Sequence, residues 1–190
     1  MILIRHGQTE FNRIFSQTRE DPGIRDPDLT AAGRRQAAAL AAALAGLPGP
    51  KPRRLIASPY RRALETAEIV AATHGLPIAV EALVAERCVF ACDIGSPRAA
   101  LAERWPALAL DHLPDPWWPQ TVESEEALAE RARRFREKLA GERWREIAVV
   151  THWGFIRALT GLKVANGTVL RIDPSRPERE PELLFAPPAE

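Results

Sequence analysis

The chain has 190 residues, of which 46% are hydrophobic and 27% are charged, and its formal net charge at pH 7 is +1. This length suits one globular domain with a core of its own. The near-zero charge excludes a global basic field for nucleic acid or an anionic membrane surface, so any anion site must be built locally. No secretion signal or bilayer-spanning stretch is visible, and Cys88 and Cys92 are too few for a disulfide framework or a zinc site. We therefore expect a cytoplasmic protein with reduced thiols.

The first predicted strand, residues 1–4, is a continuous apolar run that contains two β-branched isoleucines. It ends at Arg5 and His6, which are unusual residues for the end of a buried strand. Gly7 then permits a tight turn or a close approach of the backbone to a ligand. This strand end is the first candidate for a functional site.

Helices and strands alternate along the rest of the chain. Residues 12–28 read as a polar loop, and Thr30 can cap an alanine-rich helix that runs to about residue 44. Ser58 is a suitable N-cap for a helix that begins at Pro59 and stops near Gly75. Further strands are predicted at residues 54–58, 76–81, 147–151 and 168–172.

The second half contains an irregular segment, residues 81–120, with a short helix candidate and a Pro/Trp-rich stretch, LPDPWWPQ. The two tryptophans of this stretch fit either a pocket wall or a cover for the sheet edge. Another helix can begin at Thr121 or Ser124, with acidic residues in its first turn where the helix dipole favours them. A last helix follows Gly154.

This alternation predicts an α/β fold with a mostly parallel central sheet and helices on both faces. The domain is expected to span residues 1–173, with residues 81–120 as a short irregular cap after the third strand. Residues 174–190 are rich in proline and charge and are expected to form a loosely ordered arm whose LLF stretch can dock.

A second strand end carries a histidine, because the run IAVVT is followed directly by His152. Ligands of parallel α/β sheets bind outside the carboxyl ends of the strands, where the strand order reverses. If the first and fourth strands are neighbours, His6 and His152 meet at that edge.

A further cation is predicted in the first turn of the helix after the second strand, where free N–H groups attract anions. The candidates are Arg61 and Arg62; we choose Arg61, one turn from the expected cap, and expect Arg62 to be solvated. Arg61 would then join Arg5, His6 and His152. Two guanidinium groups bind phosphate oxygens in a bidentate fashion, and a neutral imidazole can accept a phosphoryl group.

The segment RHGQTEFN, residues 5–12, resembles the signature of the histidine phosphatase superfamily, also called the phosphoglycerate mutase-like family. Later segments follow in the order of that family: DLTAAGRRQA, SPYRRALETA, LVAER, VTHWGFIRAL and NGTVLRI. The resemblance covers residues 1–172. It implies a three-layer α/β/α sandwich, in agreement with the alternation above, and an enzyme that needs no metal and no organic cofactor.

The resemblance also implies roles for single residues. His6 matches the phosphorylated nucleophile, and the groups that match the phosphate pocket are Arg5, Arg61, His152 and Asn12. Glu86, in LVAER, best matches the proton donor, with Glu81 as the runner-up and Asp93 as the third choice. A proton donor needs a raised pKa, which is expected beside apolar residues such as Val89 or Phe90.

Two departures from the family's mutases favour a phosphatase. The stretch PGIRDPDLT lacks the glycine and tryptophan that mutases carry before the first long helix, and the chain is shorter after the third strand. Trp153 stands where a small residue is frequent. We therefore expect phosphomonoester hydrolysis through a phosphohistidine on a small phosphorylated substrate, without nucleic acid or membrane partners and with the oligomeric state left open. The alternatives are phosphoglycerate mutase-type transfer and a non-catalytic phosphate-binding protein.

Overall fold

A computed structural model describes residues 1–188 of the chain and contains one six-stranded sheet with the order β3-β2-β4-β1-β5-β6. The first four strands in sequence run parallel, whereas β5 and β6 are antiparallel to their neighbours. The strands are β1 (Ile2–Arg5), β2 (Arg54–Ala57), β3 (Ile78–Val80), β4 (Ile147–Thr151), β5 (Val169–Arg171) and β6 (Glu182–Phe185). The five predicted strands and the mostly parallel sheet are confirmed.

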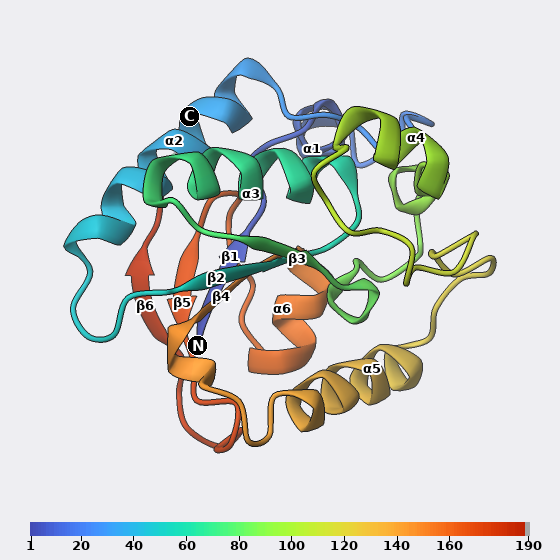
Figure 1. Ribbon diagram of the computed structural model, residues 1–190. Helices are drawn as coiled ribbons and strands as arrows, with labels where there is room; N and C mark the ends of the chain where they lie inside the picture. The colour runs from blue at the N-terminus through green and yellow to red at the C-terminus, as the bar shows by residue number, and fades with distance from the viewer. Residues whose placement is uncertain (189–190) are drawn as a thin grey trace.

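Helices cover both faces of this sheet, which confirms the three-layer sandwich. In Figure 1, α2 and α3 lie above the sheet and α5 and α6 lie below it. The helices are α1 (Glu10–Thr18), α2 (Ala31–Gly46), α3 (Arg61–His74), α4 (Arg98–Arg104), α5 (Glu125–Lys138) and α6 (Trp153–Thr160). Within residues 1–188, no helix combines the length and the hydropathy that a membrane crossing requires.

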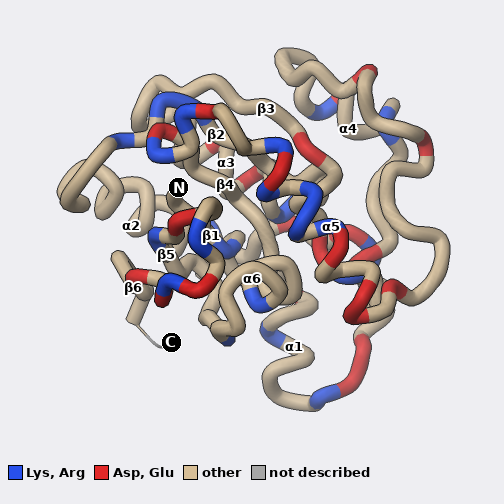
Figure 2. The backbone as a smooth tube through the Cα atoms, turned by 90° about the horizontal axis from the view of Figure 1, so that it is seen from below, with Lys and Arg blue, Asp and Glu red and all other residues tan. Residues whose placement is uncertain are grey.

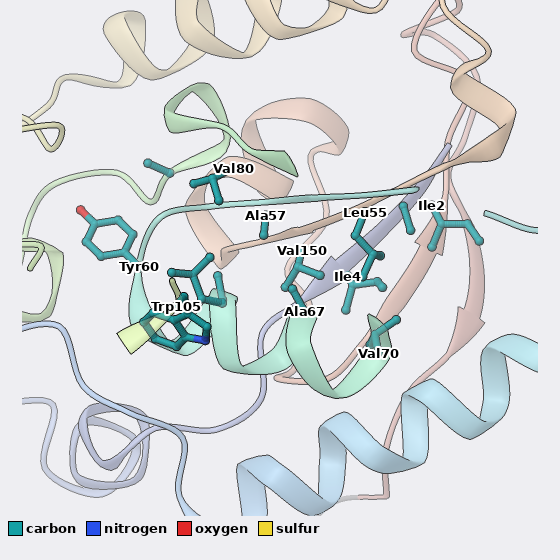
Figure 3. Close-up of a cluster of buried hydrophobic side chains, with 14 of the residues drawn as sticks. Ile2, Ile4, Leu55, Ala57, Tyr60, Ala67, Val70, Val80, Trp105 and Val150 are labelled. Carbon is teal, nitrogen blue, oxygen red and sulfur yellow. The ribbon is translucent and has the colours of Figure 1, made fainter. Parts of the chain in front are cut away.

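Alternate residues of the central strands point to opposite faces of the sheet and belong to two separate hydrophobic clusters. Ile2 and Ile4 belong to the cluster beneath α2 and α3, which Figure 3 shows, and Leu3 belongs to the cluster beneath α5 and α6. All three side chains are buried because the parallel strands are covered on both faces. Two-sided burial explains why the strand reads as a continuous apolar run.

Thr30 caps α2 and Ser124 caps α5, as the sequence predicts. The expected loop at 12–28 is wrong in its first half, because Thr9 and Asn12 form a capping box that begins α1. The helix expected after Ser58 begins later, at Arg61 with Tyr60 as its N-cap, so Ser58 is left for another contact.

The segment between β3 and α5 contains only short helical pieces: η1 (Ala82–Val84), η2 (Ala91–Asp93) and α4. Trp117 packs on Tyr60, with ring centroids 4.7 Å apart, and belongs to the core cluster beneath α3. The tryptophans do not line the cavity that contains His6, and Trp117 packs into the core beneath α3, so the stretch has a structural role close to the expected cover for the sheet.

Residues 182–185 are not part of a loosely ordered arm as we expected, because they form β6, which pairs with β5 along the edge of the sheet (Figure 1). The apolar Leu184 and Phe185 pack against the core, so this part of the arm docks. The last two residues of the expected arm, Ala189 and Glu190, lie outside the described residues. Figure 2 shows basic and acidic residues interspersed along α5 and around β1 and β6, in keeping with the low net charge.

Candidate active site

The two strand-end histidines lie side by side. β1 and β4 are parallel neighbours with Arg5 opposite Thr151, and the next residues, His6 and His152, place their ring centroids 5.0 Å apart. The backbone N–H of His6 also donates to the Thr151 carbonyl at 3.0 Å. The expectation that the histidines meet at the carboxyl edge is confirmed.

His6 is held in one tautomer by its own loop. Its Nδ1 lies 2.7 Å from the Gly7 carbonyl oxygen, which can only accept, so Nδ1 carries the proton and Nε2 has a free lone pair. Burial and the cations of Arg62 and Arg5 hold the pKa of His6 well below its usual value. The ring is therefore neutral and oriented, as a nucleophilic imidazole must be.

Gly7 is fixed by its packing. A Cβ atom at this position would collide with the Gly33 backbone, and the Gly7 N–H donates to Thr66 Oγ1 at 3.1 Å. Only a glycine lets the β1 end pass so close to the start of α2. The carbonyl that orients His6 is thus locked between two helices.

Arg5 and Asn12 bring hydrogen-bond donors to the cavity that His6 also lines. Arg5 gives one N–H to the Val164 carbonyl at 2.6 Å, and its buried Nε has no partner among the described residues. Burial lowers the pKa of Arg5 to about 10, which leaves the guanidinium charged at neutral pH. The Asn12 Oδ1 accepts from the Thr9 backbone and from Asn166 Nδ2, both at 3.1 Å. These bonds orient the Asn12 amide so that its nitrogen is the remaining donor.

The choice of Arg61 is wrong. Its side chain pairs with Asp28, outside the cavity that contains His6. Arg62, expected in solvent, is 3% exposed and lines that cavity. Its Nε donates to His152 Nδ1 at 3.3 Å, and a terminal nitrogen donates to Asp93 Oδ1 at 3.2 Å.

The later start of α3 explains this exchange. Because the helix is capped at Tyr60 and not at Ser58, the first helical residue, Arg61, faces the loop before α2 and the next one faces the sheet edge. The buried carboxylates of Asp26 and Asp93 then compensate Arg62, at 3.9 and 3.2 Å.

His152 is fully buried behind this arginine and does not line the cavity. Its Nδ1 accepts from Arg62, and its Nε2 lies 2.7 Å from Ser58 Oγ, so both ring nitrogens are used within the protein. Burial and the Arg62 charge hold the pKa of His152 well below its usual value. In this geometry His152 orients Arg62 through this hydrogen bond, and its direct contact with a phosphate stays a prediction.

Of the three acid candidates, Glu86 and Asp93 line the cavity and Glu81 does not. Glu81 caps η1 through the Leu83 N–H and pairs with Lys138. Asp93 is occupied by Arg62 and by two backbone N–H groups.

The Glu86 side chain lies against the N-terminus of α6. Its Oε1 accepts from the N–H groups of Arg87 and Gly154, both at 2.8 Å, and its Oε2 lies 3.1 Å from the Gly154 nitrogen. Burial, followed by the nearby charge of Asp93, raises the pKa of Glu86 in spite of these bonds. The direction of this shift agrees with our expectation for a proton donor.

The cavity has a volume of about 630 Å³ and changes character from its floor to its mouth. The exposed fraction of its lining rises from 2% at His6 to 37% at Phe90. Polar groups form the floor: Arg5, His6, Asn12, Arg62, Glu86 and Asn166. Apolar side chains also line the cavity: Phe11, Phe15, Val89, Phe90, Leu128 and Trp153. Of these, Val89 and Phe90 are exposed whereas Phe11 and Leu128 are buried, and the exposed part of the lining also carries Arg19, Glu125 and Arg157.

Sequence reasoning missed Asn166 and Ser58. Asn166 Nδ2 donates to the His6 carbonyl at 3.1 Å as well as to Asn12, so it ties the loop that carries His6 to the Asn12 side chain. Its segment, NGTVLRI, carried the signal, because a side-chain amide beside Gly167 precedes a strand that pairs with β1. Ser58 follows β2 just as His6 follows β1, and this equivalence was the available clue.

Comparisons with known proteins agree with this fold. A family model described as the histidine phosphatase superfamily (branch 1) matches residues 1–173. A glucosyl-3-phosphoglycerate phosphatase of Mycolicibacterium vanbaalenii is 32% identical over 190 aligned positions, which cover 90% of this chain and 78% of the relative.

Solved structures show the same fold. A mycobacterial glucosyl-3-phosphoglycerate phosphatase in complex with VO3 superposes with a TM-score of 0.64 at 24% identity, covering 96% of each chain. A phosphoserine phosphatase of Entamoeba histolytica in complex with 3-phosphoglyceric acid gives a TM-score of 0.58 at 19% identity, covering 96% of this chain and 93% of that one. With its strand-end histidines, its cavity and a family match over nearly its whole length, the chain belongs to the histidine phosphatase superfamily, branch 1.

Proposed function

We propose that His6 is the nucleophile through which this phosphatase hydrolyses phosphomonoesters. The observation that carries the proposal is the bond between His6 Nδ1 and the Gly7 carbonyl, which leaves Nε2 unprotonated in a cavity that Arg5 and Arg62 also line. Nε2 attacks phosphorus in line, the bond to the ester oxygen breaks, and a phosphohistidine forms.

Arg5, Arg62 and Asn12 would hold the transferred phosphoryl group. The unpartnered Nε of Arg5 and the free amide nitrogen of Asn12 supply donors that are already in place before the substrate binds. Donors that need no reorganisation contribute most to the stabilisation of developing charge. His152, hydrogen-bonded to Arg62, would keep that guanidinium in position.

Glu86 would act as the acid and then as the base. In its protonated form it gives a proton to the oxygen of the leaving alkoxide. The resulting carboxylate takes a proton from a water molecule, which attacks phosphorus, breaks the bond to Nε2 and releases inorganic phosphate. The raised pKa of Glu86 supports the first step, and its place on the cavity wall supports both.

A His6→Ala variant tests this proposal, with His74→Ala as the matched control. His74 Nε2 lies 2.7 Å from the Ala41 carbonyl oxygen, and the residue lies outside the cavity. We expect His6→Ala to lose turnover of an aryl phosphate and to form no acid-labile, base-stable phosphoprotein, whereas His74→Ala keeps both. Near-normal activity of His6→Ala would exclude His6 as the nucleophile.

The substrate is expected to be a small phosphorylated compound, and the name of the Mycolicibacterium relative makes glucosyl-3-phosphoglycerate one candidate. Release of inorganic phosphate separates hydrolysis from mutase-type transfer, in which label would pass between phosphoglycerates. The cytoplasmic location stays a prediction, which fractionation of cells checks.

A further inference from the structure

Three phenylalanine rings contact one another on the cavity wall; we call Phe11, Phe15 and Phe90 the phenylalanine triad. The centroids of Phe11 and Phe15 are 5.4 Å apart with nearly parallel rings. Phe90 closes the triangle at 5.5 Å from the first ring and 5.1 Å from the second. These distances are typical of favourable aromatic packing, and all three rings line the cavity.

The apolar surface at the mouth is unusual because it faces solvent. Val89 and Phe90 are 40% and 37% exposed, and both line the cavity. Trp153 of α6, which is partly exposed, adds apolar surface to the same cavity from another element. Exposed apolar groups that gather at a concave site mark a place where a ligand buries them.

Hydrogen bonds fix the triad relative to the phosphate end. Asp93 Oδ2 accepts from the backbone N–H groups of Val89 and Phe90, at 3.1 and 3.0 Å. Its other oxygen accepts from Arg62, so one carboxylate holds both the Arg62 guanidinium and the segment that carries Phe90. Asp21 accepts from the Ala91 N–H at 2.8 Å and ties the loop after α1 to the same segment. The wall is therefore preorganised, which reduces the entropy lost on binding.

The charged residues of the lining partly compensate one another. Glu125 pairs with Arg87 and lies 3.6 Å from Arg157. This carboxylate reduces the attraction of Arg87 and Arg157 for an acidic leaving group, while the exposed Arg19 lines the cavity as a further cation. The triad faces the same space with no polar atoms of its own.

We infer that the leaving group of the natural substrate carries a flat aromatic body that packs on the phenylalanine triad, so that the substrate class is aryl or arylalkyl phosphomonoesters. This inference rests on the proposed function, because the phosphate must sit at His6. The phosphate is bound on the floor, and the ring of the ester fills the mouth.

Arylalkyl and alkyl esters separate ring binding from leaving-group chemistry, because both leave as alkoxides. The experiment measures kcat/KM for 2-phenylethyl phosphate, propyl phosphate, glycerol 3-phosphate and glucosyl-3-phosphoglycerate with the wild type, Phe90→Ala and Leu162→Ala. Leu162 is as exposed as Phe90, at 38%, but does not line the cavity.

We expect the wild type to favour 2-phenylethyl phosphate over propyl phosphate by about tenfold, the scale of one good aromatic contact plus buried ring surface. Phe90→Ala lowers kcat/KM for the phenylethyl ester by about 3- to 10-fold, mainly through KM, and changes the propyl ester less than twofold. A third variant, Phe90→Trp, keeps an aromatic ring at this position and should show the wild-type preference for the phenylethyl ester. Leu162→Ala should leave kcat/KM unchanged for all four esters.

Equal efficiency with the phenylethyl and propyl esters, or a preference for either polar ester, overturns the inference while the proposed function stands, provided that hydrolysis still depends on His6. An unchanged preference in Phe90→Ala overturns it as well. Absence of any His6-dependent hydrolysis means instead that the proposed function has failed.

Discussion

A single methyl group at Gly154 tests whether the position of Glu86 matters for catalysis. Gly154 lies in the first turn of α6, and its N–H holds the Glu86 carboxylate. A Cβ atom at this position would lie less than 3.0 Å from Glu86 Oε1 and 3.3 Å from its Cδ. Ordinary contact begins at 3.4 Å, so the oxygen must withdraw by about 1.1 Å.

The expected loss follows from this shift. A misplacement of about 1 Å costs roughly 100-fold in rate, so Gly154→Ala should lower kcat/KM for alkyl phosphates by about 10- to 100-fold. The bonds from Gly154 favour the ionised carboxylate, and their weakening raises the pKa of Glu86 further. Stability should not fall in parallel, because alanine is favoured over glycine in a helix by roughly 1 kcal/mol.

The assay compares propyl phosphate with 4-nitrophenyl phosphate, whose phenolate leaves with little protonation. Gly154→Ala should slow the propyl ester far more than the nitrophenyl ester. Gly46→Ala at the end of α2 is the control, since a Cβ there meets nothing within 4 Å. Equal losses on both esters, or full activity on the propyl ester, would show that proton donation does not depend on the carboxylate at this place.

Three further predictions concern the floor of the cavity. Arg62→Ala should lower kcat/KM by about 100- to 1000-fold, the scale for one preorganised donor, whereas Arg61→Ala should change it less than twofold. Similar losses for the two variants in steady-state assays would refute the assignment of Arg62 to the phosphate site. Because Glu86 must be protonated for the first step, kcat/KM for alkyl esters should fall as pH rises through its raised pKa, and Glu86→Gln should remove this limb of the profile. Activity should survive dialysis against excess chelator, because Arg5 and Arg62 supply the positive charge; recovery only on addition of a divalent cation would contradict this.

The elements that carry the site could be predicted because their burial leaves a simple trace in the sequence. β1 and β4 are covered on both faces, so each reads as an apolar run that stops abruptly at a polar residue. The histidines directly after these runs could be placed together from the parallel topology alone. Caps such as Thr30 were equally readable, because the contact that makes a cap spans only three residues.

The choice between Arg61 and Arg62 could not be made in this way. The helix starts two residues later than expected, and each residue along a helix turns the direction of the side chain by about 100°. The shift depends on tertiary contacts: Ser58 is taken by His152, 94 positions away, and the pocket for Arg62 is lined by Asp26 and Asp93 from two separate loops. No local pattern encodes such distant partners.

The missed helix α1 links the two ends of the cavity. Asn12 closes the capping box with Thr9 that starts α1, and the same amide faces the cavity floor. The spacing of four residues between Phe11 and Phe15 puts both rings on one side of that helix, toward Phe90. The polar residue that fixes the helix start therefore also fixes the position of the phenylalanine triad relative to the cavity floor. On the two proposals above, specificity for the leaving group and binding of the phosphate would both depend on one short helix, whose cap the sequence TEFN already contained.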